Sequence, residues 1–578
     1  MESAPSLFPG KRIPPYPAEQ FCRKHPPDEK GFRMSFLISW RSLLSAALFF
    51  CAAGIIPRAE AAPVSSVSRH AGPAVSPSVL SRKKTMRHRH VVAASRSVAP
   101  ASAAGSAAAS EPLQLAASSG NAKPGSFWNE MHVLTQDNAA SSSQQRERVG
   151  VNASAMGSAW PEVRVVPELD RLLGSLGGWR QRLSDYGFDF TLTYMAEGMS
   201  NAVGGRRQGF DYSHQVVMGT DFDLEKMFGL KGLSFHMLGV QRAGRSVATD
   251  YLEKTGLIQP QQDYGAGGNV LYKLVYMYFE ESLLNKKLVV DVGRMPANIK
   301  FGTSYFGCYA LNSIICAHPT AISVSSKWRS WPFSQWGAMA RFNPGYHLYA
   351  QAGVFEASAT EGGQAGFNFS FAPLGYVIPV ELGWEPALGK DKLTGHYKIG
   401  GYFDTSDHPD PFTAIDGSPI LISHKPARIE HQRGAWYVGA DQMVWRFGPA
   451  KDQGLILFGL AGWNEGSSLA GQTQYTAGII SQGMFPSRIT DAVSLFWTWQ
   501  SVNRKITRLQ ELEYDLGYPL KNGVTLPQSN FQVLELTYTA FLTRGLKLLP
   551  DLQYIVHPDA TRSYPNALEA GFRLLAQF

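Results

Sequence analysis

The stretch that most constrains the fold is 531–578, where apolar and polar residues alternate in three successive runs. Side chains two residues apart share one face of a strand, so each run predicts a strand with one apolar and one polar face. The apolar faces carry Leu534, Leu536, Tyr538, Ala540 and Leu542, then Leu546, Leu548, Leu552, Tyr554 and Val556, then Leu568, Ala570, Phe572, Leu574, Ala576 and Phe578. Such a sheet fits between hydrocarbon and water, but alternation alone also allows a soluble sandwich.

The last residue, Phe578, favours the membrane. Bacterial outer-membrane barrels present a C-terminal strand ending in an aromatic residue to their assembly machinery, and we expect Phe578 to do the same. Only 17% of residues are charged and 12% are aromatic, with 56 Gly and 13 Trp, as expected for glycine-punctuated strands with aromatic girdles. The predicted fold is all-β, a transmembrane antiparallel barrel over residues 187–578. About 16 strands of ~10 residues with their connections would fill this span.

The net charge of +8 does not indicate nucleic-acid binding, because the excess lies outside the predicted barrel. Residues 1–61 carry +3 and residues 62–160 carry +6, which leaves the remainder close to −1. A nearly neutral body has no strong bulk preference for anions or cations. We therefore expect no nucleic-acid partner.

The N-terminal region reads as a leader followed by an arm. Residues 1–33 lack periodicity, and we expect them to be an extension assigned in error, with translation starting at Met34. Residues 34–61 have the features of a cleavable signal peptide: Arg41, an apolar core over 43–56, and a small-x-small site at 59–61. Residues 62–160 are rich in Ala, Ser and Pro, a composition that predicts disorder. For the basic cluster at 82–89 we favour a merely solvated tail, with contact to peptidoglycan or anionic lipid as the alternative.

A short amphipathic helix is expected within 161–186, bracing the periplasmic side of the barrel. Its apolar residues recur at helical spacing: Leu169, Leu172, Leu173, Leu176, Trp179 and Leu183. Glycines at 174, 177 and 178 weaken this prediction, so an extended lead-in stays open.

Several segments occur in the order found in one known family. They are Trp179-Arg-Gln-Arg-Leu-Ser-Asp-Tyr-Gly-Phe-Asp-Phe, Gly204-Gly205, Gly229-Leu-Lys-Gly, Arg242-Ala-Gly-Arg-Ser, Val292-Gly-Arg-Met, Trp336-Gly-Ala, Gln351-Ala-Gly-Val-Phe, Leu549-Pro-Asp-Leu-Gln-Tyr-Ile-Val-His-Pro and Ala570-Gly-Phe-Arg. From about Leu169 to the C-terminus the chain resembles the carbohydrate-selective porins of the OprB family. The resemblance implies an outer-membrane barrel of sixteen strands, in which inward-folded loops form a constriction that passes sugars by diffusion. The arm at 62–160 departs from compact members of that family.

A pore for neutral sugars needs groups that replace water around the hydroxyls without holding the sugar too tightly. The irregular segment 305–342 is rich in such groups, and we expect it to be an inward-folding loop with its return strand. Its candidate residues are Tyr305, Phe306, Tyr309, Asn312, His318, Lys327, Trp328, Arg329, Trp331, Gln335 and Trp336. The alternative is that its tryptophans belong to the girdle at the lipid interface, above all Trp336.

Charged residues near predicted strand ends form a second group of candidates: Arg242, Arg245, Glu280, Glu281, Asp291 and Arg294. Alternation places Asp291 opposite Val290 and Val292, toward the lumen. Arg294 has the opposite parity, and we expect it to turn inward as the strand ends before Pro296. The predicted constriction comprises Arg242, Arg245, Glu281, Asp291, Arg294, Lys327, Trp328, Arg329 and Trp331. Ordinary lumen wall is the alternative for each strand-end residue.

Cys308 and Cys316 are candidates for a disulfide in an oxidising compartment. Two unpaired thiols are the alternative, and a zinc site with His318 lacks further ligands. The sequence contains no nucleophile elbow, zinc-protease motif, phosphate loop or dinucleotide fingerprint, so we expect neither an enzyme nor a cofactor. A binding or structural barrel, such as an adhesin or cell-wall tether, is the second functional hypothesis.

Overall fold

The computed structural model describes residues 170–261, 268–316, 319–323, 326–358, 363–465, 471–520 and 523–578. The predicted extension (1–33), signal peptide (34–61) and arm (62–160) lie outside the described residues, as does His318. None of the helices in the described ranges is both long and apolar enough to cross a membrane.

One closed antiparallel sheet forms the body of the described chain. It contains seventeen strands, and without the two-residue strand β9 (Ala387–Leu388) sixteen remain. The pairing of β1 with β19, for example Tyr194 opposite Ala576, closes the barrel. The predicted sixteen-stranded barrel is therefore confirmed. Its strands are β1 (Phe188–Val203), β2 (Gly209–Asp223), β3 (Leu233–Gly244), β4 (Val270–Leu283), β5 (Leu288–Met295), β6 (Gln335–Gly345), β7 (Leu348–Ser358), β8 (Pro373–Trp384), β10 (Leu393–Asp404), β13 (Arg433–Arg446), β14 (Gly454–Asn464), β15 (Gly471–Gln482), β16 (Ala492–Val502), β17 (Asn530–Thr543), β18 (Leu546–Val556) and β19 (Ala567–Gln577).

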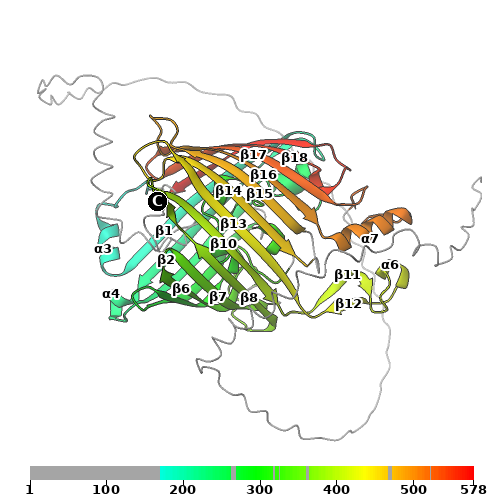
Figure 1. Cartoon of the computed structure of the whole chain (residues 1–578), viewed down its shortest axis with the longest axis horizontal. Coiled ribbons are helices and arrows are strands. Elements are labelled where there is room, and N and C mark those ends of the chain that lie inside the picture. Colours follow the sequence, from blue (N-terminus) through cyan, green and yellow to red (C-terminus); the bar gives the residue numbers. More distant parts are fainter. Residues whose placement is uncertain are drawn as a thin grey trace, which may run out of the picture. The chain divides into compact units, whose positions relative to one another are not determined.

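The two ends of the barrel differ in the length of their connections. Short turns such as 284–287, 346–347 and 544–545 lie at the end where the chain terminates, since the Gln577 amide donates to the Gly545 carbonyl. We call this the short-turn end, and it corresponds to the periplasmic end of outer-membrane barrels. Figure 1 shows α3 (Trp179–Asp185) and α4 (Leu224–Phe228) at this end.

Long connections gather at the opposite end, which we call the long-loop end. They contain η3 (Ala248–Leu252), η4 (Ala297–Ile299), η5 (Gly307–Tyr309), α5 (Thr320–Ser323), β11 (His408–Ala414), α6 (Ile420–Ser423), β12 (Ala427–Glu430), α7 (Arg504–Asp515) and η7 (Pro558–Ala560). Strands β11 and β12 form a separate hairpin, which lies near α7 in Figure 1. Lys505 of α7 and Asp410 of the hairpin form an ion pair at 2.6 Å, so the two loops are joined.

The alternating faces of the strands are sorted as a membrane barrel requires. On β17, the side chain of Leu536 lies on the outer surface and is 45% exposed, while Glu535 points inward and is fully buried. The same contrast holds on β19, where Phe572 is 39% exposed and Arg573 is 3% exposed. Because the sheet closes on itself, the apolar faces form its outer surface rather than a hidden core, which separates it from a soluble sandwich.

The helix in the predicted 161–186 region is short. Helix α3 covers Trp179–Asp185, and turns precede it from Arg171. Arg180 ties it to the barrel by donating to the carbonyls of Phe190 and Phe578, at 3.1 and 3.0 Å. The amide of Phe578 in turn donates to the carbonyl of Leu192. A bracing role for α3 stays a prediction.

Candidate constriction of the channel

The connection between β5 and β6 covers residues 296–334, and its described residues, 296–316, 319–323 and 326–334, run inside the barrel. We call it the inner loop. It begins against β8, where the Gly302 amide donates to Glu381 at 2.8 Å. It reaches the short-turn end, where the Tyr305 hydroxyl donates to Glu385 at 2.9 Å. The loop thus folds inward, as the sequence predicts for this region.

The middle of the inner loop lies against the opposite wall. The Thr537 hydroxyl of β17 donates to the Tyr309 carbonyl at 2.8 Å, and the Gln474 amide group of β15 donates to the Ile314 carbonyl at 2.8 Å. The loop then returns past β14 to β10, where the Lys327 amide donates to Asp404 at 2.8 Å. It therefore contacts strands all around the lumen.

Cys308 and Cys316 are bonded as a disulfide. This confirms the predicted pair and removes both the free-thiol and the zinc alternatives for these residues. The bond closes residues 308–316 into a small ring, which we call the loop tip. Main-chain hydrogen bonds within it, such as that from the Cys316 amide to the Asn312 carbonyl, make the tip a compact unit.

Arg242 and Trp331, two of the predicted constriction residues, meet at a glutamine that sequence reasoning missed. The Arg242 Nε and the Trp331 Nε1 both donate to the Gln215 Oε1, at 2.8 and 3.1 Å. Arg242 and Gln215 are buried, whereas Trp331 is half-buried. Gln215, an inward-facing residue of β2, therefore links Arg242 of the barrel wall to Trp331 of the inner loop.

Asp291 faces the lumen, as alternation predicts, and is 1% exposed. Its partner is Lys300 of the inner loop, whose ammonium lies 2.7 Å from the carboxylate and 3.2 Å from the Tyr278 hydroxyl. Lys300 was missed because nothing in its local sequence distinguishes it from a surface lysine. The pair joins the start of the inner loop to β5.

The other predicted loop residues have different roles. Trp328 is 2% exposed and packs against Phe301 and Tyr402, so it anchors the loop to the wall rather than presenting a face to open lumen. Arg329 donates to the Ser358 carbonyl at 3.3 Å. Lys327 is half-buried beside β10.

Two strand-end residues, Arg245 and Glu281, lie away from the contacts between the inner loop and the wall. Arg245 is 68% exposed and pairs with Asp250 at 2.6 Å in the loop after β3. Glu281 lies on the outward face of β4 with Phe279 and Leu283, next to the short-turn end. It is therefore remote from the inner loop, because its side-chain parity is the lipid-facing one.

The expectation that Arg294 turns inward is wrong. Arg294 stays in register opposite Trp336 on β6, and Trp336 shares the outward face with Ala338 and Phe342. Its guanidinium donates to the Gly366 and Asn368 carbonyls at 2.5 and 3.1 Å. The loop 363–372 thus supplies acceptors on the outer surface, so no inward turn is needed. Trp336 belongs to the outer face, as its girdle alternative states.

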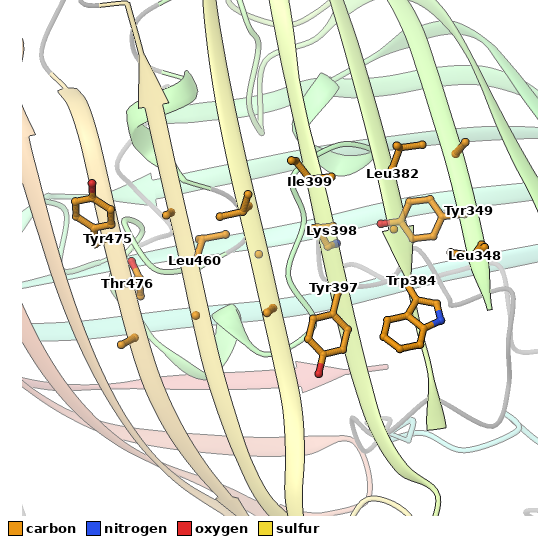
Figure 2. A pocket seen from close by; sticks show the side chains of 18 of the residues that line it. Leu348, Tyr349, Leu382, Trp384, Tyr397, Lys398, Ile399, Leu460, Tyr475 and Thr476 are labelled. Atoms are coloured by element: carbon orange, nitrogen blue, oxygen red, sulfur yellow. The ribbon is translucent and has the colours of Figure 1, made fainter. Parts of the chain in front are cut away.

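A hollow of about 940 Å³ lies on the outer face of the wall (Figure 2). It spans β6 to β16, and most of its lining is apolar. Outward side chains that line it include Leu382, Ile399, Ala440, Ala461 and Ala477. Its small residues leave a concavity in the surface that faces hydrocarbon, so it carries no information about the channel.

The closed barrel with an apolar outer surface, a polar interior and an inward-folded loop defines the class of outer-membrane porins. A comparison with protein families gives the particular group. The chain belongs to the carbohydrate-selective porins of the OprB family, whose family model matches residues 207–578. The protein is accordingly a channel for carbohydrates in the outer membrane of a Gram-negative bacterium.

Individual relatives agree with this membership. The chain is 28% identical over 425 residues to Porin B of Pseudomonas aeruginosa, covering 71% of this chain and 92% of that protein. It is 25% identical over 448 residues to the putative porin QuiX of Acinetobacter baylyi, covering 74% and 98%. The high-pH structure of OprB from Pseudomonas putida superimposes with a TM-score of 0.66 at 26% identity, covering 72% of this chain and all of that one.

Proposed function

We propose that the inner loop forms the constriction of the sugar channel, that Trp331 contacts the sugar there, and that Arg242 positions the Trp331 ring through Gln215. The observation that carries this proposal is the circuit of the loop inside the barrel, from Glu381 on one wall to Thr537 on the other. Any solute that crosses the barrel must pass this segment. Its side chains therefore decide which solutes do so.

The proposed mechanism is a balanced exchange of hydrogen bonds without covalent chemistry. A sugar hydroxyl entering the constriction loses water and gains hydrogen-bond donors and acceptors of the loop and the wall. The half-buried Trp331 ring offers an apolar face to the ring of the sugar. Passage requires that these contacts be strong enough for entry and weak enough for release.

Planar-bilayer recordings test the proposal with a matched pair of tryptophans. Trp331→Ala should weaken the block of single-channel current by maltose, because the ring facing the path is lost. Trp336→Ala is the control, because Trp336 lies on the outer face. Equal sugar block in Trp331→Ala and the unmodified protein would contradict the proposed role of the inner loop.

The N-terminal regions and Phe578 are proposed to act in export and membrane assembly of the protein. We infer that a signal peptide over 34–61 is cleaved during export and that Phe578 is presented to the barrel-assembly machinery, with the basic arm as a solvated tail or, alternatively, in contact with peptidoglycan. The support for Phe578 is its place at the end of the seam strand β19. Mass spectrometry of the mature N-terminus, and pull-down of the arm with purified peptidoglycan, test the first and last of these inferences.

A further inference from the structure

The loop tip, residues 308–316, is held on the far wall of the barrel by side chains of three adjacent strands. Glu535 of β17 accepts hydrogen bonds from the successive amides of Leu311 and Asn312, at 2.5 and 3.2 Å. Gln553 of β18 accepts from the Asn312 side-chain amide at 2.8 Å. Arg573 of β19 donates to the carbonyls of Ala310 and Leu311, at 3.3 and 3.4 Å.

We propose that Glu535, Gln553 and Arg573 are positioning residues that fix the aperture of the channel by docking the loop tip. This inference rests on the proposed function, in which the inner loop is the constriction. None of the three residues needs to touch sugar. They act through the loop, and their contribution is to keep the loop in one place.

The docking contacts are of a strong kind. Glu535 and Gln553 are fully buried, and Arg573 is 3% exposed. Hydrogen bonds from main-chain amides to a carboxylate are charge-assisted and exceed neutral ones in strength. Arg573 forms an ion pair with Glu197 of β1 at 2.6 Å. This pair orients the N–H groups of Arg573 toward the loop tip in advance.

The three residues are not needed to form the sheet itself. Strands β17, β18 and β19 are joined by regular main-chain pairing, for instance Glu535 opposite Gln553 and Gln553 opposite Glu569. Glu535 instead directs its bonded oxygen to the loop. Because the Cys308–Cys316 bond makes the tip one unit, losing the dock would loosen the tip as a whole and widen the passage. Thr537 and Gln474 would still bond to the Tyr309 and Ile314 carbonyls, so the tip would shift rather than leave the wall.

The test compares four variants of the full chain, each refolded or exported into membranes and checked for barrel formation by heat-modifiable gel migration. Glu535→Leu removes the acceptor, and Asn312→Ala weakens the dock from the loop side while leaving the wall intact. Glu535→Gln keeps an acceptor oxygen of the same shape. Glu569→Gln is the control, because neither carboxylate oxygen of Glu569 bonds to any group in the described chain.

Single-channel conductance and liposome swelling with glucose, maltose and maltotriose are the measurements. Glu535→Leu and Asn312→Ala should raise conductance and flatten the dependence of the swelling rate on sugar size. In Glu535→Leu, the loss of hydrogen bonds to a charged group should raise the population of undocked loop about tenfold or more. In Asn312→Ala the lost bond is to the neutral side chain of Gln553, so the rise should have the same direction and be smaller. Glu535→Gln keeps an acceptor oxygen but loses the charge, so its channel should lie between Glu535→Leu and the unmodified protein. Glu569→Gln should stay close to the unmodified channel.

The outcomes separate this inference from the proposed function. Unchanged conductance and size dependence in Asn312→Ala, together with altered sugar block in Trp331→Ala, would overturn the dock and leave the constriction in place. Unchanged behaviour in both variants would overturn the constriction and the dock with it. If Glu535→Leu does not form a barrel, the conductance and size dependence of Asn312→Ala test the dock instead. A Glu569→Gln channel whose conductance rises as much as that of Asn312→Ala would also refute the dock.

Discussion

Glu197 on β1 and Arg573 on β19 face each other across the seam that closes the barrel. They are direct partners in the register, and the Arg573 guanidinium lies 2.6 Å from the Glu197 carboxylate. Both side chains are buried, at 0% and 3% exposure. The first and last strands are therefore joined by a charge pair as well as by their main-chain ladder, and the same arginine reaches the loop tip.

Replacing Glu197 by Ala should destabilise the closed barrel by about 3 kcal/mol or more, because the mutation leaves a buried guanidinium without its counter-charge. Urea unfolding in detergent, followed by tryptophan fluorescence, measures the loss. In Glu197→Ala combined with Arg573→Met, the effects should be far from additive, since neither charge remains unpaired. Additive losses would show that the two side chains act independently.

Arg242 and Arg294 should behave differently in the channel although both are buried arginines. Arg242→Gln should reduce anion preference and sugar block, since Arg242 faces the lumen beside Trp331. Arg294→Gln should leave both unchanged, because its guanidinium bonds to the outer loop 363–372. Reversal potentials in a salt gradient and maltose titration of the current measure these effects.

The fold was accessible from the sequence because period-two alternation translates directly into faces of a sheet. Glu535, Asp551 and Arg573, which alternate with leucines and Phe572, are all buried inside the barrel. Closure was also predictable, since strands that cross a membrane must pair all their main-chain groups. The number of sixteen strands came from the family resemblance and fits the length of the span at ~10 residues a strand. The position of Asp291 followed from the same rule.

The constriction was predictable only in part, because its contacts link residues distant in sequence. Gln215 and Trp331 are 116 positions apart, and Glu535 and Leu311 are 224 apart. Alternation gives the face of a side chain but not its height along the barrel, which is why Arg245 was grouped with Arg242. Glu281 was an error of face, because its side chain shares the outward parity of Phe279. The error for Arg294 arose because its partners are carbonyls of a loop, which leave no signal in residue type.

A charged substitution on the outer surface should lower the stability of the barrel, and the loss should depend on the depth of the residue in the bilayer. Ile479 on β15 is 49% exposed on the outer face and lies opposite Leu495 of β16, which is 43% exposed on the same face. Ile479→Arg should destabilise the barrel by about 2–4 kcal/mol if it lies near the bilayer midplane.

Leu230→Arg is the control for this change, because Leu230 is also 49% exposed but lies in the turn after α4. Its cost should be about 0–1 kcal/mol. Reversible unfolding in lipid vesicles provides both values. Equal losses at the two positions would argue against the assignment of the apolar outer face to the hydrocarbon region.

The junction between the β11–β12 hairpin and α7 should loosen in acid. Burial favours a raised pKa for Asp410, but hydrogen bonds from Lys505 and from the amides of Phe412 and Thr413 outweigh it and hold that pKa below its ordinary value. A carboxylate with a depressed pKa stabilises the folded state above its ordinary pKa of about 3.9, and this contribution is lost as pH falls through the folded value. Stability of the junction should therefore be constant from neutral pH to about pH 5 and decline below about pH 4.

Hydrogen exchange of α7 between pH 2.5 and 7, corrected for intrinsic rates, measures this decline. Asp410→Asn should lose about 1–3 kcal/mol of local protection at neutral pH, because a charged acceptor of three hydrogen bonds is replaced by a neutral one. Its protection should then no longer depend on pH in the acid range. A steep acid transition that persists in Asp410→Asn would assign the pH dependence to another carboxyl group, the nearest candidate being Glu430, which pairs with Arg428 at 2.6 Å on the same hairpin.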